Sequence, residues 1–225
     1  VIIDTEAAAT ITIDDDIAGD DIVNAAEAAG DVTITGTVGG DAKPGDTVTL
    51  TVNGNSTDYT GTVKADGTYS INVPGSELVA DADSTIVASV SGTDEAGNPF
   101  TATTEASGDN KDGGYEVDTD ISKPTIDLVA SSDSGDSDTD NLTNDKTPTF
   151  SLGNIDDDVV AAGIVVLKDG VALEGTLTEE QDGTWSFTPS ADLADGTYDL
   201  SVKVTDDAGN SATSTELEVI IDTEA

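Results

Sequence analysis

Apolar residues alternate with Thr, Ser and Asp along many short stretches of this chain. In the stretch 47–52, Val48, Leu50 and Val52 share one face, and three threonines occupy the other. A period of two residues is typical of β-strands that bury one face. The pattern predicts seven strands in the first half of the chain, at residues 11–13, 32–38, 47–52, 58–64, 68–73, 85–91 and 100–104.

The second half repeats this order of strands and turns. Its predicted strands occupy residues 125–130, 149–152, 163–168, 171–178, 184–187, 197–204 and 212–221. A helical period of 3.6 residues is confined to short Ala-rich pieces such as 23–29, and no apolar run is long enough to span a bilayer. Seven short strands with regularly spaced turns fit an immunoglobulin-like sandwich. We therefore expect an all-β chain of two tandem immunoglobulin-like β-sandwich domains, residues 1–117 and 118–225, joined by a short linker.

A short motif recurs at the start, middle and end of the chain. Residues 1–7 and 219–225 have the same sequence, Val-Ile-Ile-Asp-Thr-Glu-Ala, and a related Val-Asp-Thr-Asp occupies 117–120. The spacing is 114 residues from Asp4 to Asp118 and 104 from Asp118 to Asp222. Repetition at the length of one small domain predicts that this motif is the joint between repeated units.

Charge narrows the range of functions. The chain has 47 acidic residues against 7 Lys, a formal net charge of −40, and no His or Cys. Nucleic acid and anionic membrane surfaces are poor partners, because both are bound by clustered cations. Disulfides and zinc–thiolate sites are excluded. Among the acids Asp outnumbers Glu by 35 to 12, and Asp concentrates in the predicted loops.

Several motifs match between the two halves. Asp-Gly-Thr-Tyr-Ser at 66–70 pairs with Asp-Gly-Thr-Trp-Ser at 182–186, and Thr-Asp-Glu-Ala-Gly-Asn at 93–98 pairs with Thr-Asp-Asp-Ala-Gly-Asn at 205–210. With the Asp-Thr joints, Thr-Asn-Asp-Lys-Thr-Pro at 143–148 and Leu-Ala-Asp-Gly-Thr-Tyr at 193–198, the chain resembles the bacterial Ig-like repeats of giant type I-secreted adhesins, the RTX and biofilm-associated adhesins. The resemblance covers the whole chain and is looser in residues 1–117.

This resemblance implies a structural module rather than an enzyme. It implies extracellular display on a bacterial cell surface, extension of an adhesive tip, and rigidity that depends on calcium. The expected partners are neighbouring repeats of the same chain, with the host or surface ligand bound elsewhere in the full protein. We expect a monomer that neither binds nucleic acid nor inserts into a membrane.

The strand order indicates which acidic loops meet at a joint. The loops after the second, fourth and sixth strands lie where each domain begins, and those after the first and fifth lie at the opposite end. Carboxylates so concentrated repel one another unless a cation is bound. Ca²⁺ binds six to eight oxygen atoms and fits better than Mg²⁺, which tends to keep its waters. The predicted ligands are Asp4, Asp14, Asp16, Asp20, Asp81, Asp94, Asn98, Asp118, Asp120, Asp133, Asp136, Asp138, Asp140, Asp206, Asp207, Asn210 and Asp222.

Other interpretations of these residues stay open. Asp94 with Asn98, and Asp206 with Asn210, could cap turns without a metal. The run Asp14–Asp16 could be solvated. The cluster at 133–140 superficially resembles an EF-hand loop, but its Gly is misplaced and no Glu closes it.

An enzyme is disfavoured, because no His is present to activate a Ser or Thr, and two small sandwiches with few aromatic residues lack an enclosed cleft for glycosidase chemistry.

A different class of function is a ligand-binding domain pair. Threonines alternate at 33, 35 and 37 and at 47, 49 and 51, and such ladders could bind ice or a glycan. Outward-facing polar positions of a half-buried strand explain the same pattern.

Overall fold

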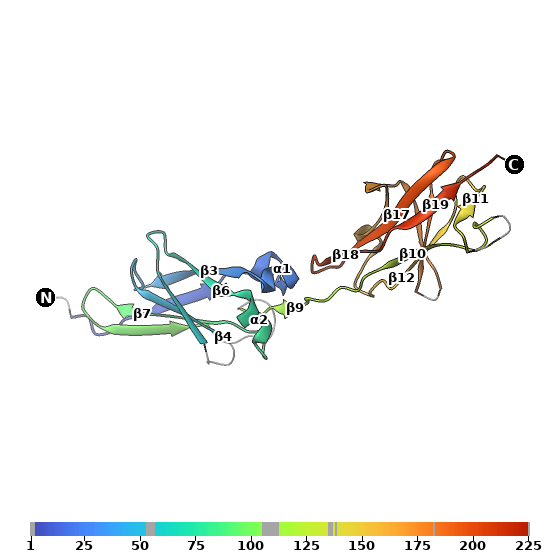
Figure 1. The fold of residues 1–225 in the computed structure, drawn as a ribbon. Helices are drawn as coiled ribbons and strands as arrows, with labels where there is room; N and C mark the ends of the chain where they lie inside the picture. The colour runs from blue at the N-terminus through green and yellow to red at the C-terminus, as the bar shows by residue number, and fades with distance from the viewer. Residues whose placement is uncertain are drawn as a thin grey trace. The chain divides into compact units, whose positions relative to one another are not determined.

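A computed structural model describes residues 3–52, 57–104, 113–134, 137, 139–181 and 183–224 of the chain. The chain forms two compact units, unit 1 at Val1–Thr119 and unit 2 at Asp120–Ala225 (Figure 1). The structure is nearly all β, as the alternating pattern predicts. Within the described residues, no helix is long and apolar enough to cross a membrane.

Unit 1 is built from two antiparallel sheets. The first has the strand order β1-β3-β6 and the second β5-β4-β7-β8. Their bounds are β1 Ala9–Ile13, β3 Asp31–Gly40, β6 Thr68–Pro74, β5 Thr57–Thr62, β4 Thr47–Val52, β7 Val87–Thr93 and β8 Pro99–Thr103.

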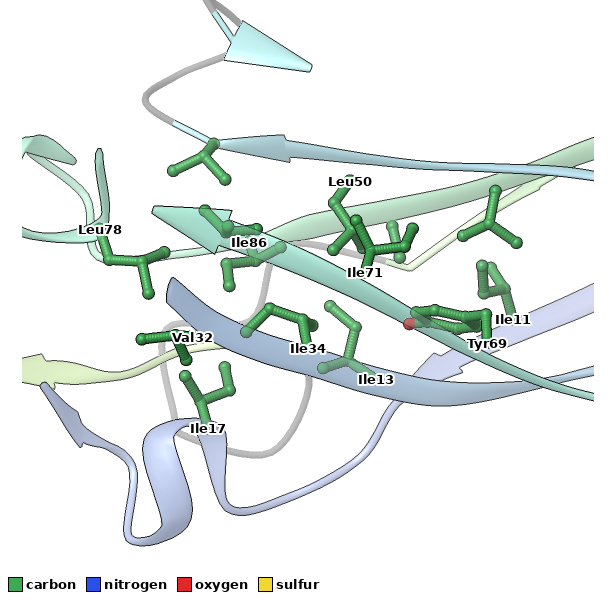
Figure 2. Packing of buried hydrophobic residues seen from close by; sticks show 14 of the residues in the cluster. Ile11, Ile13, Ile17, Val32, Ile34, Leu50, Tyr69, Ile71, Leu78 and Ile86 are labelled. Atoms are coloured by element: carbon green, nitrogen blue, oxygen red, sulfur yellow. The ribbon is translucent and has the colours of Figure 1, made fainter. Parts of the chain in front are cut away.

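The apolar faces of these sheets form one core. Figure 2 shows Ile34 of β3, Tyr69 and Ile71 of β6 and Leu50 of β4 directed into the same space. Leu50 and Tyr69 are fully buried, and the hydroxyl of Tyr69 donates to the carbonyl of Thr12 at 2.9 Å. Burial raises the pKa of the Tyr69 hydroxyl, so it remains a donor.

Short elements gather at one end of unit 1 (Figure 1). They are the 3₁₀ turn η1 (Ile17–Gly19), β2 (Ile22–Val23), α1 (Ala25–Ala28), α2 (Gly75–Ala80) and β9 (Glu116–Val117). Asn24 begins α1, because its side chain accepts from the amide of Glu27 at 3.0 Å while the Glu27 carboxylate accepts from the amide of Asn24 at 3.0 Å. This reciprocal cap fixes a helix of a single turn.

Unit 2 has the same sandwich architecture of two sheets. Its strands are arranged differently from residue 171 onward. One sheet has the order β10-β12-β16-β15, and the other β11-β19-β17-β13-β14, with β18 paired to β17. Their bounds are β10 Thr125–Leu128, β12 Phe150–Gly153, β16 Trp185–Pro189, β15 Gly175–Glu179, β11 Leu142–Thr143, β19 Leu217–Ile221, β17 Gly196–Thr205, β13 Ile164–Lys168, β14 Val171–Ala172 and β18 Ser211–Thr213, and the 3₁₀ turn η2 is Ala161–Gly163.

Two predicted strands of unit 2 are each split. The stretch 171–178 becomes β14, which pairs with β13, and β15, which pairs with β16 in the other sheet. The stretch 212–221 becomes β18 and β19. In unit 1 the corresponding strand, β5, stays whole, and its pairing partner within the described residues is β4. A chain that changes sheets must break its ladder, and residues 173–174 provide the break.

Candidate metal centres

The acidic loop after β1 is held beside the last residues of unit 1. β2 pairs in parallel with β9, and the pairing places Ile22 opposite Glu116 and Val23 opposite Val117. The amide of Glu116 donates to the carbonyl of Asp21 at 2.7 Å, and the amide of Asp118 donates to that of Val23 at 3.1 Å. The predicted loop and joint are therefore brought together within this unit.

Unit 2 repeats the arrangement with different side chains. β11 pairs in parallel with β19, the amide of Ile220 donates to the carbonyl of Asn141 at 2.9 Å, and that of Asp222 donates to Thr143 at 2.9 Å. Asn141 and its counterpart Asp21 both have a left-handed backbone, with φ of 58° and 65°. We call these two pairings, β2 with β9 and β11 with β19, the parallel arms.

The residue before each left-handed position caps the turn into the parallel arm. Oδ1 of Asp20 accepts from the amide of Ile22 at 3.1 Å, and Oδ1 of Asp140 accepts from the amide of Leu142 at 3.3 Å. Each carboxylate keeps its second oxygen for other ligands, since a carboxylate has several lone pairs. These contacts agree with both the turn-capping and the metal interpretation of Asp20 and Asp140.

A second acidic loop lies at the same end of unit 1. Asp81 is 5% exposed, and its Oδ2 lies 3.1 Å from the hydroxyl of Tyr115, three residues before Asp118. Asp83 is exposed, and the neighbouring Asp81 raises the pKa of its carboxyl through their side-chain contact. Two carboxylates in contact disfavour double ionisation unless a cation lies between them.

Asp94 and Asn98 lie at the opposite end of unit 1. Oδ1 of Asp94 accepts from the amide of Asn98 at 2.7 Å, and Oδ2 accepts from Nδ2 of Asn98 at 2.7 Å. Nδ2 also donates to the carbonyl of Asp4 at 3.2 Å, so the first joint motif lies against this turn. The bonds from Asn98 lower the pKa of the Asp94 carboxyl.

The corresponding turn of unit 2 contains a further carboxylate that the sequence interpretation missed. Asp206 accepts from the amide of Asn210 at 2.7 Å and from its Nδ2 at 3.0 Å, and both residues are 7% exposed. A carboxylate oxygen of Asp158 lies within 4.8 Å of one of Asp206. Asp158 belongs to the run Asp156–Asp158, in the loop after β12. The sequence predicts that this loop lies at the end where unit 2 begins, so the run of three acids could have identified Asp158 as a further candidate ligand.

Asp133 has the most unusual environment among the predicted ligands. It is 6% exposed, and Oδ2 accepts from the amide of Asn141 at 3.2 Å. Among the described residues, Oδ1 of Asp133 is a buried side-chain oxygen with no hydrogen-bond partner. Burying such an atom without a partner costs several kcal/mol on the order-of-magnitude scale for polar groups. Asp136 and Asp138 of the same predicted cluster lie outside the described residues.

The remaining predicted ligands are more exposed. Oδ2 of Asp14 accepts from the hydroxyl of Thr35 at 2.7 Å, and Asp16 is exposed with a left-handed backbone, φ 71°. Asp120 and Asp207 are exposed as well. Oδ1 of Asp222 accepts from the amide of Glu224 at 3.1 Å.

Two threonines of the first ladder form side-chain hydrogen bonds within unit 1. Thr33 donates its hydroxyl to Asn72 Oδ1 at 2.9 Å, and the hydroxyls of Thr12 and Thr37 lie 2.8 Å apart. These side chains point outward, as expected for a half-buried strand. These hydrogen bonds engage Thr33 and Thr37 of the first ladder.

Comparisons with known proteins identify the class to which this fold belongs. Residues 120–223 match the family described as bacterial Ig-like domain. A structure from a 1.5-MDa bacterial ice-binding adhesin is 30% identical, with a TM-score of 0.60 over 98% of this chain and 67% of that one. A Ca²⁺-stabilized adhesin with which an Antarctic bacterium binds ice is 32% identical, with a TM-score of 0.60 over 99% of this chain and 51% of that one.

The chain belongs to the bacterial Ig-like repeats found in large adhesins. The predicted membership in the bacterial Ig-like repeats of large adhesins and the immunoglobulin-like fold class are thereby confirmed. The chain spans about two thirds of the first relative and half of the second. No curated protein sequence is similar to it.

Proposed function

We propose that this chain is an extender segment of a bacterial cell-surface adhesin, and that Ca²⁺ bound at its joints makes it rigid. The observation that carries the proposal is the parallel arm. It occurs in both units, and in both it holds an acidic loop against the residues that lead to the next joint. A feature built twice at the same place, with different side chains, favours a role in connecting repeats.

The ligand atoms at the ends of the two units support calcium as the bound cation. The polar groups there are carboxylates, an amide and backbone carbonyls, which suit a hard cation. The buried Oδ1 of Asp133 would gain a partner on binding a cation, and the paired oxygens of Asp158 and Asp206 would lose their repulsion. Ca²⁺ accepts the irregular geometry of such loops, whereas Mg²⁺ demands an octahedron.

We assign the linker ligands from chain continuity. The amide of Ser122 donates to Oδ2 of Asp156 at 2.6 Å, which fixes the start of unit 2 beside the loop after β12. We propose Asp118 and Asp120, which precede Ser122 by four and two residues, as the ligands from the linker, and Asp158 and Asp206 as the ligands that the start of unit 2 supplies. The matching residues of the first joint are Asp4, Asp94 and Asn98.

The last joint of the chain has its own proposed ligand set. Asp133, Asp136, Asp138 and Asp140 would bind a cation that orders the loop before β11, and Asp222 would belong to the joint that follows. In unit 1 the equivalent set is Asp14, Asp16, Asp20 and Asp81. Asp207 would join Asp206 and Asn210.

Rigidity follows from electrostatics. The chain has a net charge of −40, and salt largely screens repulsion only between charges more than about 10 Å apart, so acidic groups closer than that still repel one another. A cation that binds the native joints and not the unfolded chain stabilises them by mass action, by about 2.7 kcal/mol at a hundred times Kd. Such a segment would project an adhesive region away from the cell, as a monomer joined to further repeats outside the bacterium.

Small-angle X-ray scattering of the two-unit chain tests this function. Calcium should give a sharply defined longest dimension, and chelator should broaden or shorten it reversibly. The double variant Asp118→Asn with Asp120→Asn should behave in calcium as the parent does in chelator. The matched control is Asp127→Asn with Asp199→Asn, which removes the same charge from two exposed strand positions. Identical profiles in calcium and chelator would refute the proposed mechanism.

A further inference from the structure

Unit 2 contains a hollow whose lining includes none of the proposed calcium ligands. It has a volume of about 350 Å³, within the ~300–1,000 Å³ range of small-molecule sites. The loop after β12 forms one side, and Trp185 of β16 with Glu179 of β15 forms the other. Its lining includes Asp156, Asp157, Val160, Glu179 and Trp185.

Trp185 lies at the edge of the core. It alternates with Phe187 along β16, so both point to the core side of the sheet, where Phe187 is 3% exposed. Trp185 packs against the core but stays half-buried. In unit 1 the matching residue, Tyr69, is fully buried and hydrogen-bonded. The aromatic side chain is thus fully buried in unit 1, whereas in unit 2 it stays half-buried and lines the hollow.

A carboxylate lies directly opposite this ring. Glu179 is the cross-strand partner of Trp185 in the β15–β16 ladder. It alternates with Leu177, which packs against the core, so Glu179 also points to the core side of the sheet. Directly opposed residues of an antiparallel pair have Cβ atoms about 5 Å apart. The hollow therefore combines an aromatic face with a negative charge.

The remaining lining is apolar and acidic. Val160 is 53% exposed and supplies an apolar wall, and Asp156 and Asp157 add two carboxylates. Among the described residues that line the hollow, none is basic. The ion pair that the described part of unit 2 does form joins Lys168 and Asp169, which are not among the lining residues. These lining residues therefore supply no positive charge to balance the carboxylates.

We propose that this hollow binds the side chain of a lysine on a partner protein. Charge complementarity selects a cation, because three carboxylates line the site. The ring of Trp185 attracts an ammonium group through its π face, and the apolar wall suits the methylene stem of lysine. A free metal ion would leave the wall and the ring unused, and a neutral sugar would leave the carboxylates without a charged partner. The inference goes beyond the extender function and does not depend on it.

The single tryptophan of the chain reports on this site directly. The probe is Nα-acetyl-lysine methylamide, titrated into the two-unit chain in calcium at constant ionic strength, with Trp185 emission as the readout. The control probe, Nα-acetyl-norleucine methylamide, lacks only the ammonium group, and a methyl glucoside tests the sugar. The lysine probe should give a saturable change, and the other two should not.

A pair of variants tests the role of the carboxylate. Glu179→Gln should weaken the lysine probe about fivefold, the scale expected for one partly exposed charge contact. Glu218→Gln removes the same charge from an exposed position of β19 and should leave binding unchanged. Both variants should melt as the parent does.

Three outcomes would overturn the assignment. They are equal binding of the norleucine probe, saturable binding of the glucoside in place of the lysine probe, and the absence of saturation by lysine. Chemical shifts of the Trp185 indole proton give a second readout of the same titrations, independent of quenching.

Discussion

Asp222 donates its backbone amide hydrogen to the carbonyl oxygen of Thr143, 2.9 Å away. This bond closes the parallel arm of unit 2, and the side chain of Thr143 holds the arm from the other side. Its hydroxyl donates to the carbonyl of Ser132 and accepts from the amide of Asp145 at 3.0 Å. Thr143 is 1% exposed, so water cannot replace these partners.

Thr143→Val should therefore destabilise unit 2. The substitution keeps the shape and leaves the buried carbonyl of Ser132 and the half-buried amide of Asp145 without this partner, at a cost of about 1–3 kcal/mol. Urea unfolding followed by the fluorescence of Trp185 measures unit 2 alone, because unit 1 has no Trp. Thr176→Val, at an exposed position of β15, is the control and should stay within about 0.5 kcal/mol. Equal effects of the two variants would contradict a structural role for Thr143.

Asp133→Asn should act in opposite directions with and without calcium. In chelator the variant should be at least as stable as the parent, since it removes the charge from a buried carboxyl whose Oδ1 has no partner among the described residues. In calcium the parent should gain stability and the variant should gain less, because one anionic ligand is lost. Thermal melts monitored by Trp185 fluorescence measure both effects.

The comparison for Asp133 is Asp199→Asn, which changes an exposed carboxylate on β17. It should lower neither the melting temperature in chelator nor the gain from calcium. A calcium-induced gain in Asp133→Asn as large as that of the parent would remove Asp133 from the ligand set.

The sequence predicts the long strands of this chain well, because alternation marks them directly. Val48, Leu50 and Val52 are 0–1% exposed, as their spacing implies. It does not predict β2, β9 or β11, because two-residue strands are too short to show a period. Their pairing depends on left-handed positions such as Asp21, where local turn geometry decides the direction of the chain.

Some of the candidate ligands can likewise be predicted from the sequence, and others cannot. Asp206 and Asn210 were recognisable because Thr-Asp-Asp-Ala-Gly-Asn has a counterpart at 93–98. Asp158 was missed because its run of three acids has no counterpart in the equivalent loop of the first half, residues 39–46. The burial of Asp133 could not be predicted from a loop composition that indicates solvent exposure.

Acid should weaken unit 1 through Asp94. Its folded pKa lies below the ordinary value of 3.8, first because of the side-chain bond from Asn98. The carboxylate therefore contributes stability above pH 3.8, and that contribution disappears as the pH falls through the folded pKa. Hydrogen exchange of β7 and β8 amides in chelator should show protection falling on acidification. Asp94→Asn should flatten this decline, and Glu95→Gln, its exposed neighbour, should preserve it.

Asp83 should behave with the opposite sign. Its folded pKa is raised by Asp81, so its contribution to stability is present below the unfolded value of 3.8 and is lost as the pH rises through the folded pKa. In chelator at neutral pH, Asp83→Asn should raise the protection of amides near Asp81, because it relieves the like-charge contact. The gain should vanish in acid, where the parent carboxyl is protonated. Reduced protection at neutral pH would show that the contact is not repulsive.

Asp158→Asn should weaken calcium binding at the end of unit 2 that contains Asp206. The two carboxylates have oxygens within 4.8 Å of one another, so each raises the affinity of the other for a cation. Isothermal titration with CaCl₂ should show one class of sites weakened about tenfold, equivalent to about 1.4 kcal/mol. Asp169→Asn provides a matched charge change away from this turn and should leave every affinity unchanged. Calcium binding by Asp158→Asn as tight as that of the parent would exclude Asp158 as a ligand and leave Asp206 and Asn210 as a turn cap.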